Sequence, residues 1–292
     1  MSRTLIGLAS LALLVPGCSG TLPAPSDGIG STATSSTATP GPVARPTDPG
    51  ELVLRIESGG GLLPPLGRER QLPSLSIYGD GLVLVPRPQA AEVDPAGSEV
   101  AAFRLEAELV DEIVIAAREV GLRGADRQLP QEGPEFTADA GATIVTVVAD
   151  GARHVTSADA LFDAADESDE RELLLRFVER LLALTPPAGG LDPYLAPSYR
   201  VFVAAPDPGF GPELEDAVPA AWPFDEPLAT WGEPIPPDGL TVDARCGVVD
   251  EATFADALAA LRGATVQTVV EDEVGDRAIV AWRPILPDEA GC

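Results

Sequence analysis

The sequence contains no lysine, one histidine and one methionine. Its 19 basic residues stand against 46 acidic residues, so the net charge is -27 at pH 7. Proteins that bind DNA or RNA need a basic surface that contacts the phosphates, and this charge balance argues against a nucleic-acid partner. An acidic surface keeps molecules apart by mutual repulsion, but it does not identify a ligand.

Motifs that identify a reaction or a cofactor are also missing. His154 is the only histidine that could activate a serine nucleophile, and no Gly-x-Ser-x-Gly turn presents such a serine. The glycines at 59–61 match neither a dinucleotide-binding pattern nor a phosphate loop. The sequence therefore predicts no catalytic residue, no cofactor and no metal site, and we expect His154 to be an ordinary strand residue.

Carboxylates are the one group abundant enough to support catalysis. A pair of them performs acid–base chemistry in glycosidases, and a hydrolase of this kind, with or without a divalent cation, is the alternative function. The densest acidic cluster lacks the Asp-x-Asp-x-Asp-Gly spacing of a calcium loop, so we interpret it as a solvated loop and helix start. Its members are Asp163, Asp166, Glu167, Asp169, Glu170 and Glu172.

The longest apolar run lies at the N-terminus. Arg3 precedes an apolar stretch from Leu5 to Val15, which has the length of a secretory signal and is too short to span a bilayer. Val15-Pro16-Gly17-Cys18 resembles the lipobox of bacterial lipoproteins, with Pro16 as its less usual residue. We therefore predict a signal peptide over residues 1–17 and a lipid on Cys18.

Lipidation of Cys18 would hold the protein at the outer face of the cytoplasmic membrane. Ordinary secretion, with cleavage near Gly17 or Gly20, is the alternative. The residues after Cys18 are rich in Ser, Thr, Pro, Gly and Ala and contain no aromatic residue. They cannot bury enough apolar surface to fold, and we expect a flexible tether over residues 18–50.

Two cysteines remain once Cys18 is assigned to the lipid. Cys246 and Cys292 form one candidate pair in an oxidising compartment, and we expect a disulfide between them. By the chain-entropy model, a loop of about 45 residues gives roughly 4 kcal/mol of stabilisation. Two free thiols are the alternative, and a metal site that also uses the single histidine is a weaker one.

Hydrophobic periodicity predicts an α+β domain over residues 51–185. Its expected order is strand, hairpin, helix, hairpin and helix, with both helices on one face of an antiparallel sheet. The hairpins turn at Asp80-Gly81 and Asp150-Gly151, because glycine adopts the positive φ that such turns require. The buried stripe of the first helix is expected to contain Leu109, Ile113, Ala116 and Val120.

Residues 186–238 are expected to form a proline-rich connection with one short strand. A smaller α+β domain is expected over residues 239–292. Asp250 is expected to cap its helix, and Phe254, Leu258 and Leu261 of this helix are expected to face the core of the domain. Trp222 and Trp231 lie in the connection. Such residues can anchor a protein or cell-wall partner, and packing in the core is the alternative.

Four motifs after the tether are distinctive. They are Ile77-Tyr78-Gly79-Asp80-Gly81-Leu82-Val83, Phe224-Asp225-Glu226-Pro227-Leu228, Arg245-Cys246-Gly247, and Arg283-Pro284-Ile285-Leu286-Pro287-Asp288-Glu289 with Cys292. The chain resembles in these residues an uncharacterised family of actinobacterial exported proteins, many of them lipoproteins. Its first half also resembles a domain of unknown function from bacterial envelope proteins. The resemblance implies a compartment and a fold, and it transfers no activity, ligand or site residue.

These observations predict a lipid-anchored envelope protein without catalytic activity. We expect it to bind a protein or cell-wall partner or to have a structural role. The hydrolase with paired carboxylates remains the alternative, and the sequence leaves the oligomeric state open.

Overall fold

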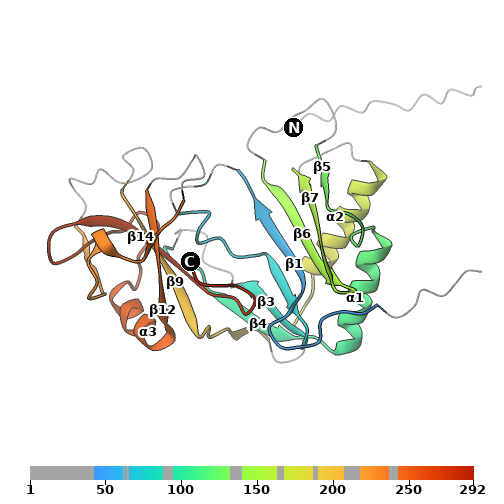
Figure 1. The fold of residues 1–292 in the computed structure, drawn as a ribbon, viewed down its shortest axis with the longest axis horizontal. Coiled ribbons are helices and arrows are strands. Elements are labelled where there is room, and N and C mark those ends of the chain that lie inside the picture. The colour runs from blue at the N-terminus through green and yellow to red at the C-terminus, as the bar shows by residue number, and fades with distance from the viewer. Residues whose placement is uncertain are drawn as a thin grey trace, which may run out of the picture. The chain divides into compact units, whose positions relative to one another are not determined.

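Two β-sheets and three α-helices make up the described part of the chain (Figure 1). They belong to one compact unit, Pro42–Cys292, and the α+β prediction is confirmed. Within the described ranges, no helix combines the length and apolar character needed to cross a bilayer. The computed structural model describes residues 43–61, 63, 66–87, 95–131, 140–162, 168–186, 190–206, 218–236 and 243–292.

The first sheet has the strand order β5-β7-β6-β1-β2-β3-β4-β8, and only the β5–β7 pair is parallel. Its strands are β1 (Leu52–Gly59), β2 (Leu75–Tyr78), β3 (Leu82–Pro86), β4 (Val100–Arg104), β5 (Arg127–Leu129), β6 (Ala142–Ala149), β7 (Ala152–Asp159) and β8 (Asp192–Pro193).

Both predicted hairpins form, and their turns explain why. Gly81 has a φ of 80° between β2 and β3, and its amide donates to the carbonyl oxygen of Tyr78. Asp150 and Gly151 have φ values of 52° and 75° between β6 and β7. Two consecutive residues with positive φ match the right-handed twist of the strands they join, as in type I′ turns.

Two helices, α1 (Ala107–Glu119) and α2 (Asp169–Leu182), pack on one face of the first sheet, as Figure 1 shows. The predicted stripe of α1 is wrong in part, because Leu109 is 37% exposed. The buried residues of α1 instead follow the spacing i, i+3, i+4 and i+7 and are Val110, Ile113, Val114 and Ala117. Both stripes fit a helical period, and packing on the sheet selects the second.

The second sheet has the order β10-β13-β14-β9-β12-β11, and its one parallel pair is β10–β13. A short 3-10 helix, η1 (Leu228–Thr230), lies between β10 and β11 in the chain. The strands are β9 (Ser198–Ala204), β10 (Ala220–Ala221), β11 (Glu233–Pro234), β12 (Ala244–Asp250), β13 (Val269–Glu271) and β14 (Arg277–Pro284).

The third helix, α3 (Glu251–Ala260), follows β12 directly. The carboxylate of Asp250 caps it by accepting a 2.8 Å hydrogen bond from the amide of Thr253, as predicted. Phe254 and Leu261 are buried, but Leu258 is 39% exposed and does not face the core as expected. It lies instead at a groove described below.

The domain boundaries differ from the predicted ones. The expected connection, residues 186–238, contains β9, which lies between β14 and β12 in the second sheet. Residues 95–98 of the first half also donate and accept hydrogen bonds with the second half. These pairings join the two expected domains into one unit, and long-range pairing of this kind leaves no local signal in the sequence.

The folded part also begins before the predicted end of the tether at Gly50. Ala44 and Asp150 exchange hydrogen bonds, and Arg45 pairs with Asp111 at 2.5 Å and donates to the carbonyl oxygen of Gly79 at 2.9 Å. Residues from 43 on are therefore part of the fold. The predicted signal peptide, Cys18 and residues 19–42 lie outside the described residues.

The chain end, residues 285–292, is called the C-terminal segment below. The predicted disulfide forms between Cys246 in β12 and Cys292, with the two Cα atoms 5.7 Å apart. Leu286 packs with Tyr78 and Leu84 on the face of the first sheet opposite α1 and α2. The C-terminal segment therefore covers one sheet while it is bonded to the other.

Buried charges fix the C-terminal segment in place. Asp288 accepts hydrogen bonds from Arg55 at 2.6 Å and from the Tyr78 hydroxyl at 2.9 Å. Burial lowers the pKa of Arg55, but the attraction of Asp288 and other negative groups outweighs this and raises it. Glu289 lies 2.7 Å from Arg283 in β14 and 3.3 Å from Arg200 in β9.

Candidate functional site

Residues 95–99 connect the two sheets and are called the crossing segment below. The amide of Ala96 donates to the carbonyl oxygen of Ala264, and the amide of Ser98 donates to that of Trp282 in β14. The Trp282 amide donates to Ala96 in return. The crossing segment thus pairs alongside β14 at Trp282 and continues into β4 of the first sheet.

A groove with a volume of about 470 Å³ lies beside the crossing segment. It is bounded by residues 193–195 at the end of β8, by Tyr199 of β9, by α3 and the residues that follow it, and by the end of β14. This volume lies within the range of small-molecule sites. Four aromatic side chains line the groove, namely Tyr194, Tyr199, Phe254 and Trp282.

Three of the aromatic rings are packed against one another. Tyr199 and Phe254 stack with their ring centroids 3.9 Å apart, and Phe254 lies 6.2 Å from Trp282. Burial raises the pKa of Tyr199 and also that of Tyr194. Both phenols therefore stay protonated near neutral pH and can donate a hydrogen bond from an otherwise apolar wall.

Exposed apolar and charged groups surround this wall. Leu195 is 69% exposed and Leu258 is 39% exposed, so both present apolar surface at the rim. Arg87 pairs with Glu99 at 3.0 Å, and both side chains are more than half exposed. Arg262 also lines the groove, and within the described residues it forms no hydrogen bond or ion pair.

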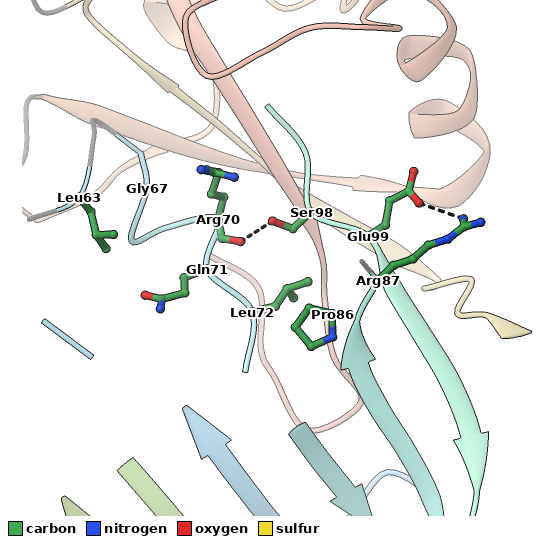
Figure 2. Close-up of a pocket in the computed structure, with 9 residues that line it drawn as sticks. All are labelled: Leu63, Gly67, Arg70, Gln71, Leu72, Pro86, Arg87, Ser98 and Glu99. Atoms are coloured by element: carbon green, nitrogen blue, oxygen red, sulfur yellow. Dashed lines mark hydrogen bonds and ion pairs between the residues drawn. The ribbon is translucent and has the colours of Figure 1, made fainter. Parts of the chain in front are cut away.

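A smaller pocket of about 260 Å³ lies on the other side of residues 98–99 (Figure 2). It shares Arg87, Ser98 and Glu99 with the groove. Figure 2 shows the Ser98 hydroxyl directed at the carbonyl oxygen of Arg70, to which it donates at 2.9 Å. Arg70 in turn donates to the carbonyl oxygen of Pro95 at 3.2 Å. These bonds fix the crossing segment between the two hollows.

The predicted partner contacts, Trp222 and Trp231, are buried in the core of the second sheet, and the prediction of surface recognition is wrong. Only 9% and 5% of their surfaces are exposed. The Trp222 indole donates to the carbonyl oxygen of Glu226 at 2.8 Å, and that of Trp231 donates to Val201 at 3.1 Å. Proline-rich sequence around them suggested an exposed loop, but the loop folds back on the sheet.

One edge of Trp222 reaches a third hollow of about 250 Å³, which also contains Asp225, Asp272 and Glu273. Asp272 accepts hydrogen bonds from the amides of Leu228, Val274 and Asp276. Desolvation acts to raise the pKa of Asp272, but these hydrogen bonds outweigh it and lower the pKa. Asp272 therefore stays ionised and stabilises its own loop.

The same conclusion applies to other carboxyls. Asp80 and Asp250 also have a lowered pKa, as Asp272 does. A glycosidase-type mechanism needs one carboxyl with a raised pKa that donates a proton. No observation in this part of the chain favours the alternative function as a hydrolase.

Three of the remaining candidates from the sequence, His154, Glu170 and Glu172, have structural partners. His154 lies in β7, and its Nδ1 is 2.7 Å from the carbonyl oxygen of Gly124, as expected of an ordinary strand residue. Glu170 pairs with Arg127, and Glu172 pairs with Arg176 at 2.9 Å. No group of three or more potential ligands for a metal ion occurs among the described residues. Asp163, Asp166 and Glu167 lie outside them.

Comparison of the chain with protein-family models, with curated proteins and with solved structures found no match. The candidate site is therefore assigned from the geometry of the structure alone. Sequence reasoning singled out none of the groove residues Tyr194, Tyr199, Gly97 and Arg262. Tertiary contacts bring β8, α3 and the crossing segment together around the groove, and short sequence motifs do not encode such contacts.

Gly97 provides a test of the site's construction. A methyl group at this position would overlap the indole ring of Trp282, which lies against the crossing segment. Gly97→Ala is expected to lower the stability by about 1–3 kcal/mol, as overpacking does, and to be measurable as a lower Tm. Gly124→Ala is the control, since the nearest atom to its new methyl group is 3.7 Å away. Equal Tm values for the two variants would contradict the packing described.

Proposed function

We propose that the protein is a lipid-anchored binding protein of the bacterial envelope that receives part of a protein or cell-wall partner in the groove. The observation that carries this proposal is the wall of four aromatic rings beside the exposed side chains of Leu195 and Leu258. Aromatic residues and arginine are the types that most often supply binding energy at protein interfaces. Apolar surface that remains open to solvent is stabilised when a partner covers it.

The groove is also built to keep its shape. The crossing segment is bonded to β14 and to Arg70, and Tyr199 is stacked on Phe254. A site whose walls are already ordered loses less conformational entropy when a ligand binds. This supports binding in preference to a purely structural role.

The anchor part of the proposal rests on the sequence alone. The apolar run before Cys18 and the residues that flank it favour lipidation, and the lack of lysine and the acidic charge disfavour direct attraction to anionic lipids. The covalent lipid would then supply the membrane attachment that the folded surface does not.

Photocrosslinking in intact cells tests the groove. A photoreactive side chain that replaces Leu195 is expected to form an adduct with an envelope component. The same group in place of Phe162, which follows β7 in the chain and is 55% exposed, is not expected to form one. Adding Leu258→Glu should reduce the adduct about tenfold or more, because burial of a leucine contributes roughly 1.5–3 kcal/mol. Equal adducts from both positions, or an adduct that survives Leu258→Glu, would contradict the proposal.

Cys18 provides a separate test of the anchor. Cys18→Ser should move the protein from the membrane fraction into the medium or leave it as an unprocessed precursor, because serine cannot accept the thioether-linked lipid. The folded part should keep its Tm. Ser19→Ala is the matched control and should leave membrane attachment unchanged. Membrane attachment that survives Cys18→Ser would show that lipidation at this residue is not the anchor.

A further inference from the structure

The charge at the groove is opposite in sign to that of the chain. The whole sequence has 19 basic and 46 acidic residues. By contrast, the charged residues that line the groove are Arg87, Arg262 and Glu99. Glu99 is already paired with Arg87, which leaves the guanidinium of Arg262 as the uncompensated charge of the lining.

The acidic residues that act on the aromatic wall from outside the lining do not neutralise Arg262, because they are paired with other arginines or lie at the other end of α3. Asp288 and Glu289 both act on Tyr194, but they are held by Arg55 and by Arg283 and Arg200, respectively. Glu251 acts on Tyr199 from the first turn of α3, at the opposite end of the helix from Arg262. The positive charge therefore lies at one end of the apolar wall.

We propose that the groove binds a small amphiphile with an apolar body and one carboxylate. The apolar body lies along Tyr199, Phe254 and Leu258, and the carboxylate pairs with Arg262. A guanidinium binds a carboxylate through two parallel hydrogen bonds, which are stronger than those between neutral groups. This inference rests on the groove of the proposed function and goes beyond it, because it names a free small molecule as a ligand of that groove.

Two observations favour a small ligand over an acidic protein. The volume of about 470 Å³ suits a small molecule. The net charge of -27 repels a large polyanion. A small monoanion beside Arg262 interacts mainly with that guanidinium, because salt screens charges that are more than about 8 Å away.

Calorimetric titration of the full-length chain carrying Cys18→Ser tests the inference, because this chain lacks an acyl group of its own. The probes are dodecanoate, dodecan-1-ol and dodecyltrimethylammonium, which share one apolar chain and differ in charge. Dodecanoate should bind about tenfold more tightly than the alcohol, the ratio expected of a charge-assisted hydrogen bond of about 1.5 kcal/mol. Leu258→Glu should weaken the binding of both.

Variants of Arg262 then separate charge from packing. Arg262→Gln should remove the preference for dodecanoate without changing the affinity for the alcohol, and Arg262→Glu should shift the preference to dodecyltrimethylammonium. Arg180→Gln removes the same charge from exposed surface at the end of α2 and should leave the preference intact. Circular dichroism of each variant verifies its fold.

Equal binding of dodecanoate and dodecan-1-ol to the parent chain would overturn the inference, as would a preference that survives both Arg262 variants. An adduct at position 195 that contains a protein or wall fragment, obtained from a chain that binds no dodecanoate, would also overturn it while leaving the proposed function standing. Failure of both the adduct and the titration would contradict the two together.

Discussion

A buried arginine sets the main constraint on this fold. Arg55 lies in β1 with only 9% of its side chain exposed, and a guanidinium does not lose its proton to escape burial. It therefore needs an anion within hydrogen-bonding distance. The first sheet provides Ser76 and the Tyr78 hydroxyl, which are neutral partners, while the anion is Asp288 from the other end of the chain. Burial and the charge of Asp288 raise the pKa of Tyr78, so its hydroxyl remains a donor.

This requirement brings the two sheets together. Once Asp288 is bound to β1, the adjacent Glu289 is placed between Arg283 and Arg200 of the second sheet, and Cys292 is bonded to β12. β14 runs directly into the C-terminal segment and also pairs with the crossing segment. The groove lies at this junction, and its walls come from elements that are far apart in the sequence. Its shape is therefore a consequence of the contacts that unite the sheets.

Local features of the fold could be predicted because each depends on a few neighbouring residues. Asp-Gly pairs specify the two hairpins, and Asp250 caps α3. Once Cys18 is assigned to the lipid, Cys246 and Cys292 are the one cysteine pair that remains. The domain boundaries could not be predicted in this way. Proline-rich residues flank β9, but that strand is held by hydrogen bonds on both sides, which composition does not reveal.

The candidate site was predicted less well than the fold. Trp222 and Trp231 were chosen for their residue type and their proline-rich surroundings, yet each indole finds a carbonyl partner in the core. The aromatic wall instead uses Tyr194, which follows β8 of the first sheet, and Tyr199, which lies in β9 of the second sheet. A site formed by tertiary contacts between distant elements has no spacing that a sequence pattern can show.

Hydrogen exchange of the variant Asp288→Asn shows whether the contact between Asp288 and Arg55 unites the two sheets. Loss of the anion from a buried pair costs about 3–5 kcal/mol, so exchange is expected to rise together in β1, in β14 and in the crossing segment. Asp256→Asn, at an exposed position on α3, serves as the control and should change little. Faster exchange confined to residues 285–292, with β1 and the crossing segment as protected as before, would show that other contacts unite the sheets.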